Sequence, residues 1–351
     1  MQAHEASDSV ILDLLDNQVI RALQIDPRAP FSLIAEVLGV SEQTIARRYR
    51  RLRTGGLLRV TGAVDPRALG HHDWLLRLRC RPDATGSLGE ALAQREDVSW
   101  VSVSAGGSEI VCALRARTRQ EGEDLLRQRL PNTAAVLEVT ASVLLHRFIG
   151  SDARDWHGLA NTLTDAQTAK LCSPPAAPVQ TGPVRLDAAD HALLDVLSRD
   201  GRTSFAVLAR AAGISEARVV RRISTLRAAG VLYFDLDLAE ATVGHPTSAY
   251  LWLSVTPRYL DEVGKALAEH DEVHFAAAIT GSSNLVASAT CANLDELYRY
   301  VTNTLGGLDG ITSLEISPVL RRLKQAGALT DGHRLAAPSP LRVRPAQIVV
   351  R

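Results

Sequence analysis

The sequence predicts an α+β protein in which one two-domain unit occurs twice. The first observation is an internal repeat: segment 12–58 aligns without a gap with segment 186–232 and gives 17 identities in 47 positions. The second is the order within each copy, where three short helical segments precede alternating strand-like and helix-like segments. Since the period of 174 residues is far too long for a stacked-repeat protein, the chain is a duplicated unit.

The front of each copy predicts a winged helix-turn-helix domain. In the first copy, apolar residues recur at helical spacing in segments 12–24 and 31–38. Gly39 suits a left-handed helix stop, and Ser41 is a good N-cap for a third helix. Three short helices with a tight glycine turn are typical of a helix-turn-helix. Residues 57–62 then predict the first strand of a small wing.

The third helix of each copy carries the residues suited to nucleic acid. Segment 41–59 contains six arginines and one acid, and segment 215–233 contains four arginines with Glu216. A helix that enters the DNA major groove reads bases with its first residues and binds phosphates with its cations. The predicted DNA-binding residues are therefore Gln43, Thr44, Arg47, Arg50 and Arg51 in the first copy, and Arg218, Arg221 and Arg222 in the second.

A structural role competes with DNA contact, because a run of arginines is often only a solvated helix face. Arg48 and Arg222 flank core positions and could pair with Asp16 or Asp190. We favour that structural role for these two residues, although Arg222 stays among the candidates for DNA contact. DNA contact is favoured for Arg47 and Arg51, which lie four residues apart and share a helix face.

The back of each copy predicts a ferredoxin-like sandwich in the order β-α-β-β-α-β. In the first copy we expect strands at 74–80, 98–104, 110–114 and 136–145, with helices at 86–95 and 119–130. In the second copy we expect strands at 250–255, 273–280, 285–290 and 311–319, with helices at 259–269 and 294–305.

A glycine-containing loop joins the second and third strands of each sandwich. The two loops consist of Gly106, Gly107, Ser108 and Glu109, and of Gly281, Ser282, Ser283 and Asn284. Glycine permits close approach to a ligand, but it also permits a sharp turn. On this chemistry alone a plain hairpin turn is the stronger interpretation.

Proline-rich segments set the expected domain boundaries, since proline cannot pack inside a helix or a central strand. The expected domains are winged helix-turn-helix domains at 8–64 and 184–240, sandwiches at 71–150 and 245–325, a linker at 151–183 and a tail at 331–351. Within that tail, the apolar residues 347–350 could add an edge strand.

These motifs resemble the leucine-responsive/asparagine-responsive (Lrp/AsnC) transcription regulators. The resemblance rests on Leu12-Asp13-x-x-Asp16, Asp26-x-Arg28, Gly39-x-Ser41, Arg47-Arg48-x-x-x-Leu52 and Gly56, with their counterparts in the second copy. It covers nearly the whole chain twice, and the sandwich matches the ligand-binding unit that is often called the RAM domain.

The resemblance implies a DNA-binding regulator that responds to a small molecule, commonly an amino acid. Family members dimerise through the sandwich, and the effector binds where sandwiches meet, near the glycine loops; the eight loop residues are the implied effector site. This chain is a fused double unit, which implies a dimer or tetramer of fused chains. Because the first copy has Gln43-Thr44 where the second copy has Ala217-Arg218, we expect the two half-sites of the operator to differ. Because the first glycine loop ends with Glu109 and the second with Asn284, the two effector clefts need not prefer the same molecule.

Two other functions stay open. Sirohaem decarboxylases resemble the same architecture, but their His-Cys-Tyr-x-Arg type of segment is represented here only by His274. The chain could also be an interaction protein whose helix-turn-helix domains, here called heads, have lost DNA binding. The second head is less basic and would lose it first. We favour regulation and expect no enzymatic activity.

Composition and the remaining motifs exclude several classes. The 39 basic and 39 acidic residues balance, which excludes a uniformly basic nucleic-acid coat. No apolar run is long enough for a membrane span, and no secretory signal opens the chain. Four scattered cysteines suggest a cytoplasmic protein with free thiols. The pairs His270/His274 and His71/His72 do not have the geometry of a zinc site, and we expect neither metal nor cofactor.

Overall fold

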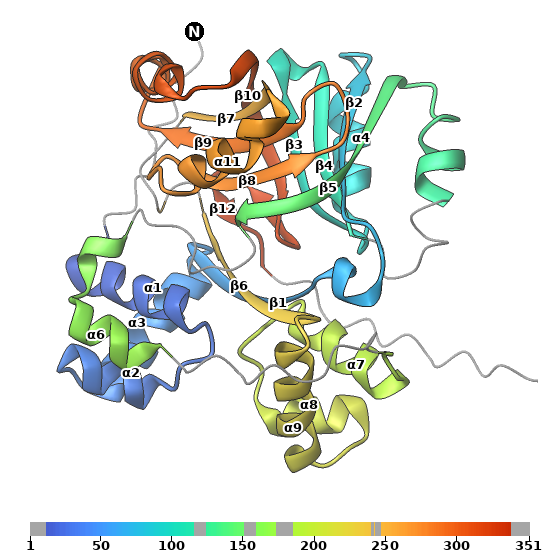
Figure 1. The fold of residues 1–351 in the computed structure, drawn as a ribbon. Helices are drawn as coiled ribbons and strands as arrows, with labels where there is room; N and C mark the ends of the chain where they lie inside the picture. The colour runs from blue at the N-terminus through green and yellow to red at the C-terminus, as the bar shows by residue number, and fades with distance from the viewer. Residues whose placement is uncertain are drawn as a thin grey trace, which may run out of the picture.

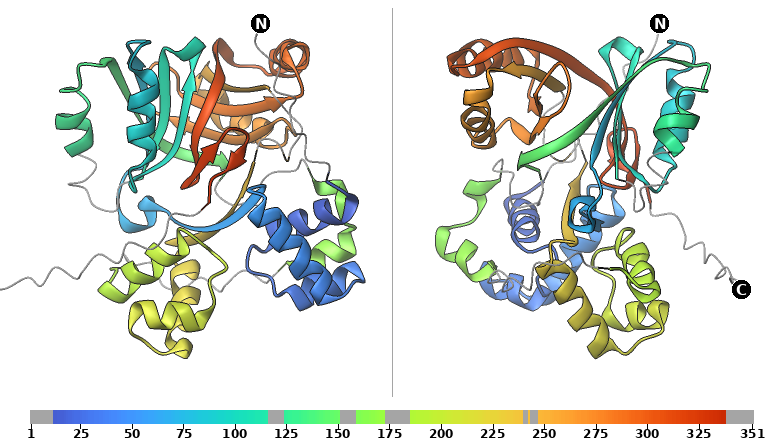
Figure 2. Two further views of the ribbon diagram at one scale, coloured as in Figure 1. Left: turned by 180° about the vertical axis from the view of Figure 1, so that it is seen from behind. Right: turned by 45° about the vertical axis from the view of Figure 1, so that its right-hand side comes forward.

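The computed structural model describes residues 12–115, 124–150, 159–172, 185–239, 242 and 247–337. It confirms the α+β fold with two helical heads and two sandwiches (Figure 1). Both heads lie on the same side of the sandwich sheets, as the views in Figure 2 also show. No helix in these ranges is long and apolar enough to cross a membrane.

The first head is built from α1 (Leu14–Ile25), α2 (Phe31–Leu38) and α3 (Glu42–Thr54). The predicted end of α2 and the predicted N-cap of α3 are confirmed: Gly39 is left-handed with φ of 69°, and the Ser41 side chain caps α3. The apolar stripes meet in one buried core, which includes Ile20, Ile34, Ile45 and Leu52.

The second head repeats this design with α7 (Ala188–Leu197), α8 (Phe205–Ala212) and α9 (Glu216–Ala228). Gly213 is left-handed with φ of 66°, and Ser215 caps α9. Its core gathers Leu193, Leu197, Leu208, Val219 and Leu226. The same pattern of apolar residues, glycine turn and serine cap therefore produces the same local fold in both units.

A single two-stranded ribbon serves both heads in place of the separate wings that the sequence suggested. Strand β1 (Leu58–Val64) pairs antiparallel with β6 (Leu232–Leu238) of the other unit. Leu236 and Leu238 of β6 pack into the core of the first head, whereas Val64 of β1 packs against the core of the second. Because each strand covers the opposite core, the ribbon joins the two heads.

The sandwiches follow the expected order. The first contains β2 (Trp74–Cys80), α4 (Thr85–Ala93), β3 (Val98–Ser104), β4 (Glu109–Leu114), a π-helical turn (Leu125–Arg129) and β5 (Val136–Ile149). The second contains β7 (Thr247–Val255), α11 (Leu260–Ala268), β8 (Val273–Ile279), β9 (Leu285–Cys291), α12 (Leu294–Arg299), a π-helical turn (Tyr300–Thr304) and β10 (Ile311–Gln325). Residues 119–123 of the expected helix at 119–130 lie outside the described residues.

The last strand of each sandwich is longer than predicted and crosses to the other one. Strand β5 pairs with β2 and then with β8, and β10 pairs with β7 and then with β3. The two sheets thus join along both edges and enclose an interior, where Leu75, Val111, Tyr250, Trp252 and Val286 form a buried cluster. The helices α4 and α11 pack on their own sheets outside this shared interior.

Part of the predicted linker at 151–183 is folded. Helix α6 (Asp165–Leu171) buries Leu171 against the core of the first head, where Leu163, just before the helix, also packs. Gln167 donates to the carbonyl of Val37 at 3.1 Å. Short strands β11 (Ala328–Asp331) and β12 (Arg334–Leu335) continue the sheet after β10. The apolar segment at 347–350 lies outside the described residues.

Candidate DNA-binding surface and ligand cavity

The third helix of each helix-turn-helix domain, α3 and α9, carries exposed cations, of which Arg47 and Arg221 are at equivalent positions. Arg47 and Arg50 on α3, and Arg218 and Arg221 on α9, are all exposed. Among the described residues, none of these four guanidiniums makes a hydrogen bond or an ion pair. Gln43 is also exposed, and the Thr44 hydroxyl lies 2.9 Å from that of Ser41 at the start of α3.

A second set of arginines in the same helices is engaged inside each head. Arg48 contacts Asp13 and Asp16, and Arg222 holds Asp190 at 2.5 and 2.6 Å, which confirms the structural role predicted for these two arginines. Arg51, which we assigned to DNA, also reaches Asp16, although its side chain stays 51% exposed.

The electrostatics of the buried acid explain why such pairing occurs. Burial alone would raise the pKa of Asp190, but the hydrogen bonds from Arg222 and from the backbone N–H of Asp187, together with the positive charge of Arg222, outweigh this effect and lower it. The arginine therefore keeps the buried carboxylate ionised. Arg222 remains a candidate for DNA contact only through the part of its side chain that is exposed, 29%.

Reciprocal contacts fix the heads to each other. Arg28 donates to the carbonyl oxygens of Gly201 and Thr203, and Arg202 donates to those of Pro27 and Ala29. These contacts flank the β1–β6 ribbon, and Gly201 is packed so closely on β1 that a Cβ atom would come within 2.8 Å of Val60. The heads form one paired unit.

The side chains at the ends of the glycine loops already have partners inside the protein. Glu109 is buried and accepts from Arg77 at 2.8 Å, and Arg77 also lies over the Trp252 ring at 4.2 Å. Asn284 donates to the carbonyl of Val255 at 2.7 Å and accepts from its N–H at 2.8 Å. Such contacts close the strand ends, as hairpin loops require.

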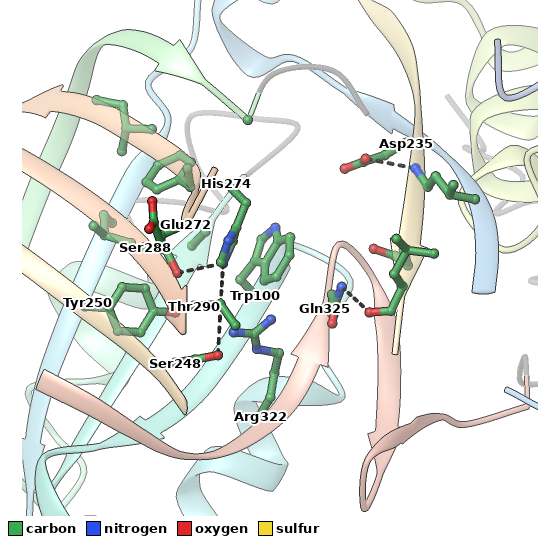
Figure 3. A pocket seen from close by; sticks show the side chains of 18 of the residues that line it. Trp100, Asp235, Ser248, Tyr250, Glu272, His274, Ser288, Thr290, Arg322 and Gln325 are labelled. Atoms are coloured by element: carbon green, nitrogen blue, oxygen red, sulfur yellow. Dashed lines mark hydrogen bonds between the residues drawn. The ribbon is translucent and has the colours of Figure 1, made fainter. Parts of the chain in front are cut away.

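A cavity of about 200 Å³ lies at the other end of the shared interior, next to the ribbon that joins the heads (Figure 3). Its wall includes Trp100 and Ala113, which lie at the ends of β3 and β4 remote from the first glycine loop. None of the eight predicted effector residues lines it. The sequence therefore pointed to a different part of the sandwich.

Two polar side chains of the cavity wall, His274 and Tyr250, have polar partners within the protein. The Nε2 atom of His274 lies 3.2 Å from the Ser288 hydroxyl and 3.3 Å from that of Thr290. The Tyr250 hydroxyl lies 3.2 Å from Ser102. In Figure 3, His274, Trp100 and Arg322 extend toward one another from three different strands, and the Arg322 guanidinium lies 5.6 Å from the centre of the Trp100 ring.

Two pairs of acidic residues line the cavity. Asp235 and Asp237 come from β6, and Asp271 and Glu272 precede β8. Asp237 is 2% exposed, and its Oδ2 atom has no hydrogen-bond partner among the described residues. Burial and, to a smaller extent, the charge of Asp235 hold the pKa of Asp237 well above its usual range.

The predictions from sequence missed most residues of this cavity. The one local signal was the run Phe234-Asp235-Leu236-Asp237-Leu238, in which acids alternate with apolar residues along one strand. The two histidines considered as a zinc pair contact different residues. His270 lies 3.0 Å from the Tyr300 hydroxyl, whereas His274 lies 3.2 Å from that of Ser288.

Comparison with known proteins identifies the family. The profile of the AsnC-type helix-turn-helix domain matches residues 12–53 and 186–227, and that of the Lrp/AsnC ligand binding domain matches residues 248–329. An uncharacterized HTH-type transcriptional regulator of Pyrococcus horikoshii is 30% identical over 145 residues, which cover 41% of this chain and 91% of the relative. The chain belongs to the Lrp/AsnC family.

Other comparisons show how this Lrp/AsnC chain is organised. The HTH-type transcriptional regulator LrpA of Pyrococcus abyssi is 28% identical over 140 residues, 40% of this chain and 99% of LrpA, and thus corresponds to a single unit. The crystal structure of the siroheme decarboxylase NirDL has a TM-score of 0.58 at 16% identity, covering 89% of this chain and 92% of NirDL. At this identity the likeness shows a shared double-unit fold.

Proposed function

We propose that this Lrp/AsnC protein is a sequence-specific transcription regulator that binds duplex DNA through α3 and α9. The observation that carries the proposal is a set of four exposed guanidiniums, Arg47, Arg50, Arg218 and Arg221, on the second helix of both helix-turn-helix motifs; within the part of the chain that the structure describes they make no hydrogen bond or ion pair. Cations on this helix bind phosphates when the helix enters a major groove. The transcriptional regulators among the relatives support the same function.

The two heads would read a pseudo-palindromic operator with unequal halves. The reciprocal contacts of Arg28 and Arg202 support a fixed spacing between the heads. The base-reading positions differ, with Gln43 and Thr44 at the start of α3 but Ala217 and Arg218 at the start of α9. Because different side chains prefer different base edges, the two half-sites should differ in sequence.

A small polar metabolite, of the amino-acid-like class, is the proposed effector, and the glycine loops remain its predicted site. Chains would associate further, as a dimer or tetramer. Exposed leucines on the two crossing strands, Leu145 on β5 and Leu320 on β10, support such contacts. The double unit would work in the cytoplasm.

Footprinting on the protein's own promoter tests DNA binding, with affinity measured over a range of salt concentrations. Arg47→Ala combined with Arg50→Ala should weaken binding and make the salt slope shallower by up to about 2, because each phosphate contact contributes about 0.9. Arg218→Ala combined with Arg221→Ala tests the second head in the same way.

The matched control is Arg299→Ala, which removes an exposed arginine from the second sandwich. It should leave the affinity and the salt slope unchanged. If only the first pair of substitutions matters, the second head does not bind DNA; if neither matters, the chain is an interaction protein and the proposal is wrong.

A tetrapyrrole decarboxylase is the second candidate, since the double-unit fold of NirDL and the position of His274 in the cavity favour it. Two observations count against it. The cavity is smaller than the roughly 300–1,000 Å³ of sites for drug-sized ligands, and its acidic wall would repel the carboxylates of a tetrapyrrole. Titration with sirohaem should leave the absorption spectrum of the pigment unchanged; a spectral shift with release of carbon dioxide would favour the enzyme.

A further inference from the structure

We propose that the cavity between the sandwiches is a ligand site for a small primary amine with an apolar body, and that the ammonium group pairs with Asp237. The site is separate from the glycine loops in position and in the chemistry it offers. Its effect on DNA binding rests on the function proposed above, but the binding itself does not.

The size of the cavity limits the ligand to a small molecule. Its volume is about 200 Å³, which is below the roughly 300–1,000 Å³ of sites for drug-sized ligands. A compound of about ten non-hydrogen atoms fits such a space, whereas a fused macrocycle does not.

The charges in the wall favour a cation. Asp73 pairs with Arg147 and lies 3.7 Å from Arg115, so this group holds one arginine more than acids. The wall also holds four further acids, Asp235, Asp237, Asp271 and Glu272, together with Arg322 and the imidazole of His274. Counted with Asp73, Arg115 and Arg147, the acids outnumber the arginines by two once Asp237 is ionised, which favours a positive group in a site partly shielded from water.

Asp237 is the acid that such a group would satisfy. Leu236 and Leu238 point into the core of the first head, so Asp237, which alternates with them along β6, faces the sandwiches. It is buried, and its Oδ2 atom lacks a donor among the described residues. A buried acceptor without a donor is costly, and an ammonium group brings three donors.

The rest of the wall provides an apolar surface for the body of the ligand. Leu75, Trp100, Leu144, Tyr250 and Phe275 all line the cavity. The hydroxyl of Tyr250 is already engaged by Ser102. An aromatic or alkyl chain could therefore pack on these side chains without leaving their polar atoms unpaired.

The position of the cavity couples it to the heads. Residues 235–238 of β6 form part of the wall, and the same strand pairs with β1 of the first head. On the other side, Gln325 of β10 donates to the carbonyl of Leu238 at 3.0 Å. A ligand that binds Asp237 thus contacts the ribbon that joins the heads, and it would favour one pose of that ribbon.

Calorimetric titration of the full chain tests the site, with tyramine, phenethylamine, histamine, putrescine and cadaverine as probes. We expect saturable binding of at least one amine. Its neutral analogue, such as 4-ethylphenol for tyramine, should bind at least about tenfold more weakly. Failure of all five amines to bind, or equal binding of an amine and its neutral analogue, would overturn the proposal.

Two variants and a control locate the binding. Asp237→Asn and Trp100→Leu should each weaken amine binding at least about tenfold, while Asp261→Asn, an exposed acid on α11, should not. Thermal unfolding verifies that each variant is folded. Unchanged amine binding by both cavity variants would place the amine elsewhere.

DNA binding measured on the same preparations separates the two proposals. If an amine binds through Asp237 but the wild-type chain binds no DNA, the ligand site stands and the regulator proposal fails. If the chain binds DNA but no amine, the ligand site alone fails. If both bind, the amine should change the DNA affinity in the wild-type chain and not in Asp237→Asn.

Discussion

Arg28 and Arg202 hold the same position in the two units, and each guanidinium donates into the loop of the opposite head. Arg202 reaches the carbonyl oxygens of Pro27 and Ala29 at 2.7 and 2.8 Å, and Arg28 reaches that of Thr203 at 3.1 Å. Each guanidinium also lies over an aromatic ring of the other head, Phe205 for Arg28 and Phe31 for Arg202. The Asp-x-Arg motif therefore joins the heads.

Loss of this contact should weaken the pairing of the heads. Arg202→Ala removes two hydrogen bonds from a charged donor and should lower the free energy of unfolding by about 2–3 kcal/mol. Arg202→Lys keeps the charge but loses the planar fork, so an intermediate loss is expected. Urea unfolding measures both effects. A wild-type midpoint for Arg202→Ala would show that the contact does not hold the heads.

The fixed pairing of the heads makes DNA binding sensitive to half-site spacing. Insertion of about 5 base pairs between the half-sites turns one of them to the opposite face of the duplex, because a helical turn takes about 10 base pairs. Gel-shift affinity should then fall to that of a single half-site and recover after insertion of a full turn. Affinity that is independent of spacing would indicate heads that move independently.

The two heads differ in how their buried acid is neutralised, and this predicts unequal effects of matched substitutions. Asp16 contacts both Arg48 and Arg51, whereas the equivalent Asp190 has Arg222 as its paired arginine, and Thr225 stands where Arg51 would be. Arg48→Ala leaves Asp16 with one arginine. Arg222→Ala leaves Asp190 without that pair, and an uncompensated buried carboxylate destabilises the fold.

We therefore expect Arg222→Ala to lower the free energy of unfolding by roughly 1–3 kcal/mol, and Arg48→Ala to lower it less. Thermal unfolding of the two variants side by side measures the difference. Arg299→Ala, an exposed arginine of the second sandwich, serves as control. Equal losses for Arg48→Ala and Arg222→Ala would mean that Arg51 does not compensate in the first head.

Local structure could be predicted from the sequence because local interactions determine it. The helices of the two heads could be predicted from helical periodicity, from the caps at Ser41 and Ser215 and from the left-handed glycines at 39 and 213. Strand alternation gave β3 within its observed bounds, Val98–Ser104. The repeat itself showed that whatever one unit forms, the other forms as well.

Contacts between the units could not be predicted in this way. Nothing in segment 57–62 shows that its strand pairs with a strand 174 residues further along, since both strands have equally suitable apolar faces. The cavity depends on such contacts, because Trp100 and Arg322 meet only when β10 extends across to β3. A loop with glycines was a more visible signal than a buried acid, although Glu109 and Asn284 of those loops already have partners.

Because the pKa of Asp237 is raised, its substitution should stabilise the protein in a way that depends on pH. The charged groups that face it are Asp235 on the same strand, Arg59 across the ribbon and Arg322 from β10, and burial dominates them to raise its pKa. The folded protein therefore holds this proton more tightly than the unfolded chain does. The stabilisation is present at low pH and is lost as the pH rises from about 4 through the raised pKa.

Asp237→Asn removes the titration and keeps the shape of the side chain. The variant should be more stable than the wild type at pH 8, by about 1–3 kcal/mol, and the difference should shrink toward pH 5. Urea unfolding at both pH values measures it, with Asp261→Asn as an exposed control whose small effect does not follow this trend. If Asp237→Asn is instead less stable at pH 8, then an ion pair with Arg59 or Arg322 outweighs burial. Asp237 would then already be charged and paired before any amine arrives.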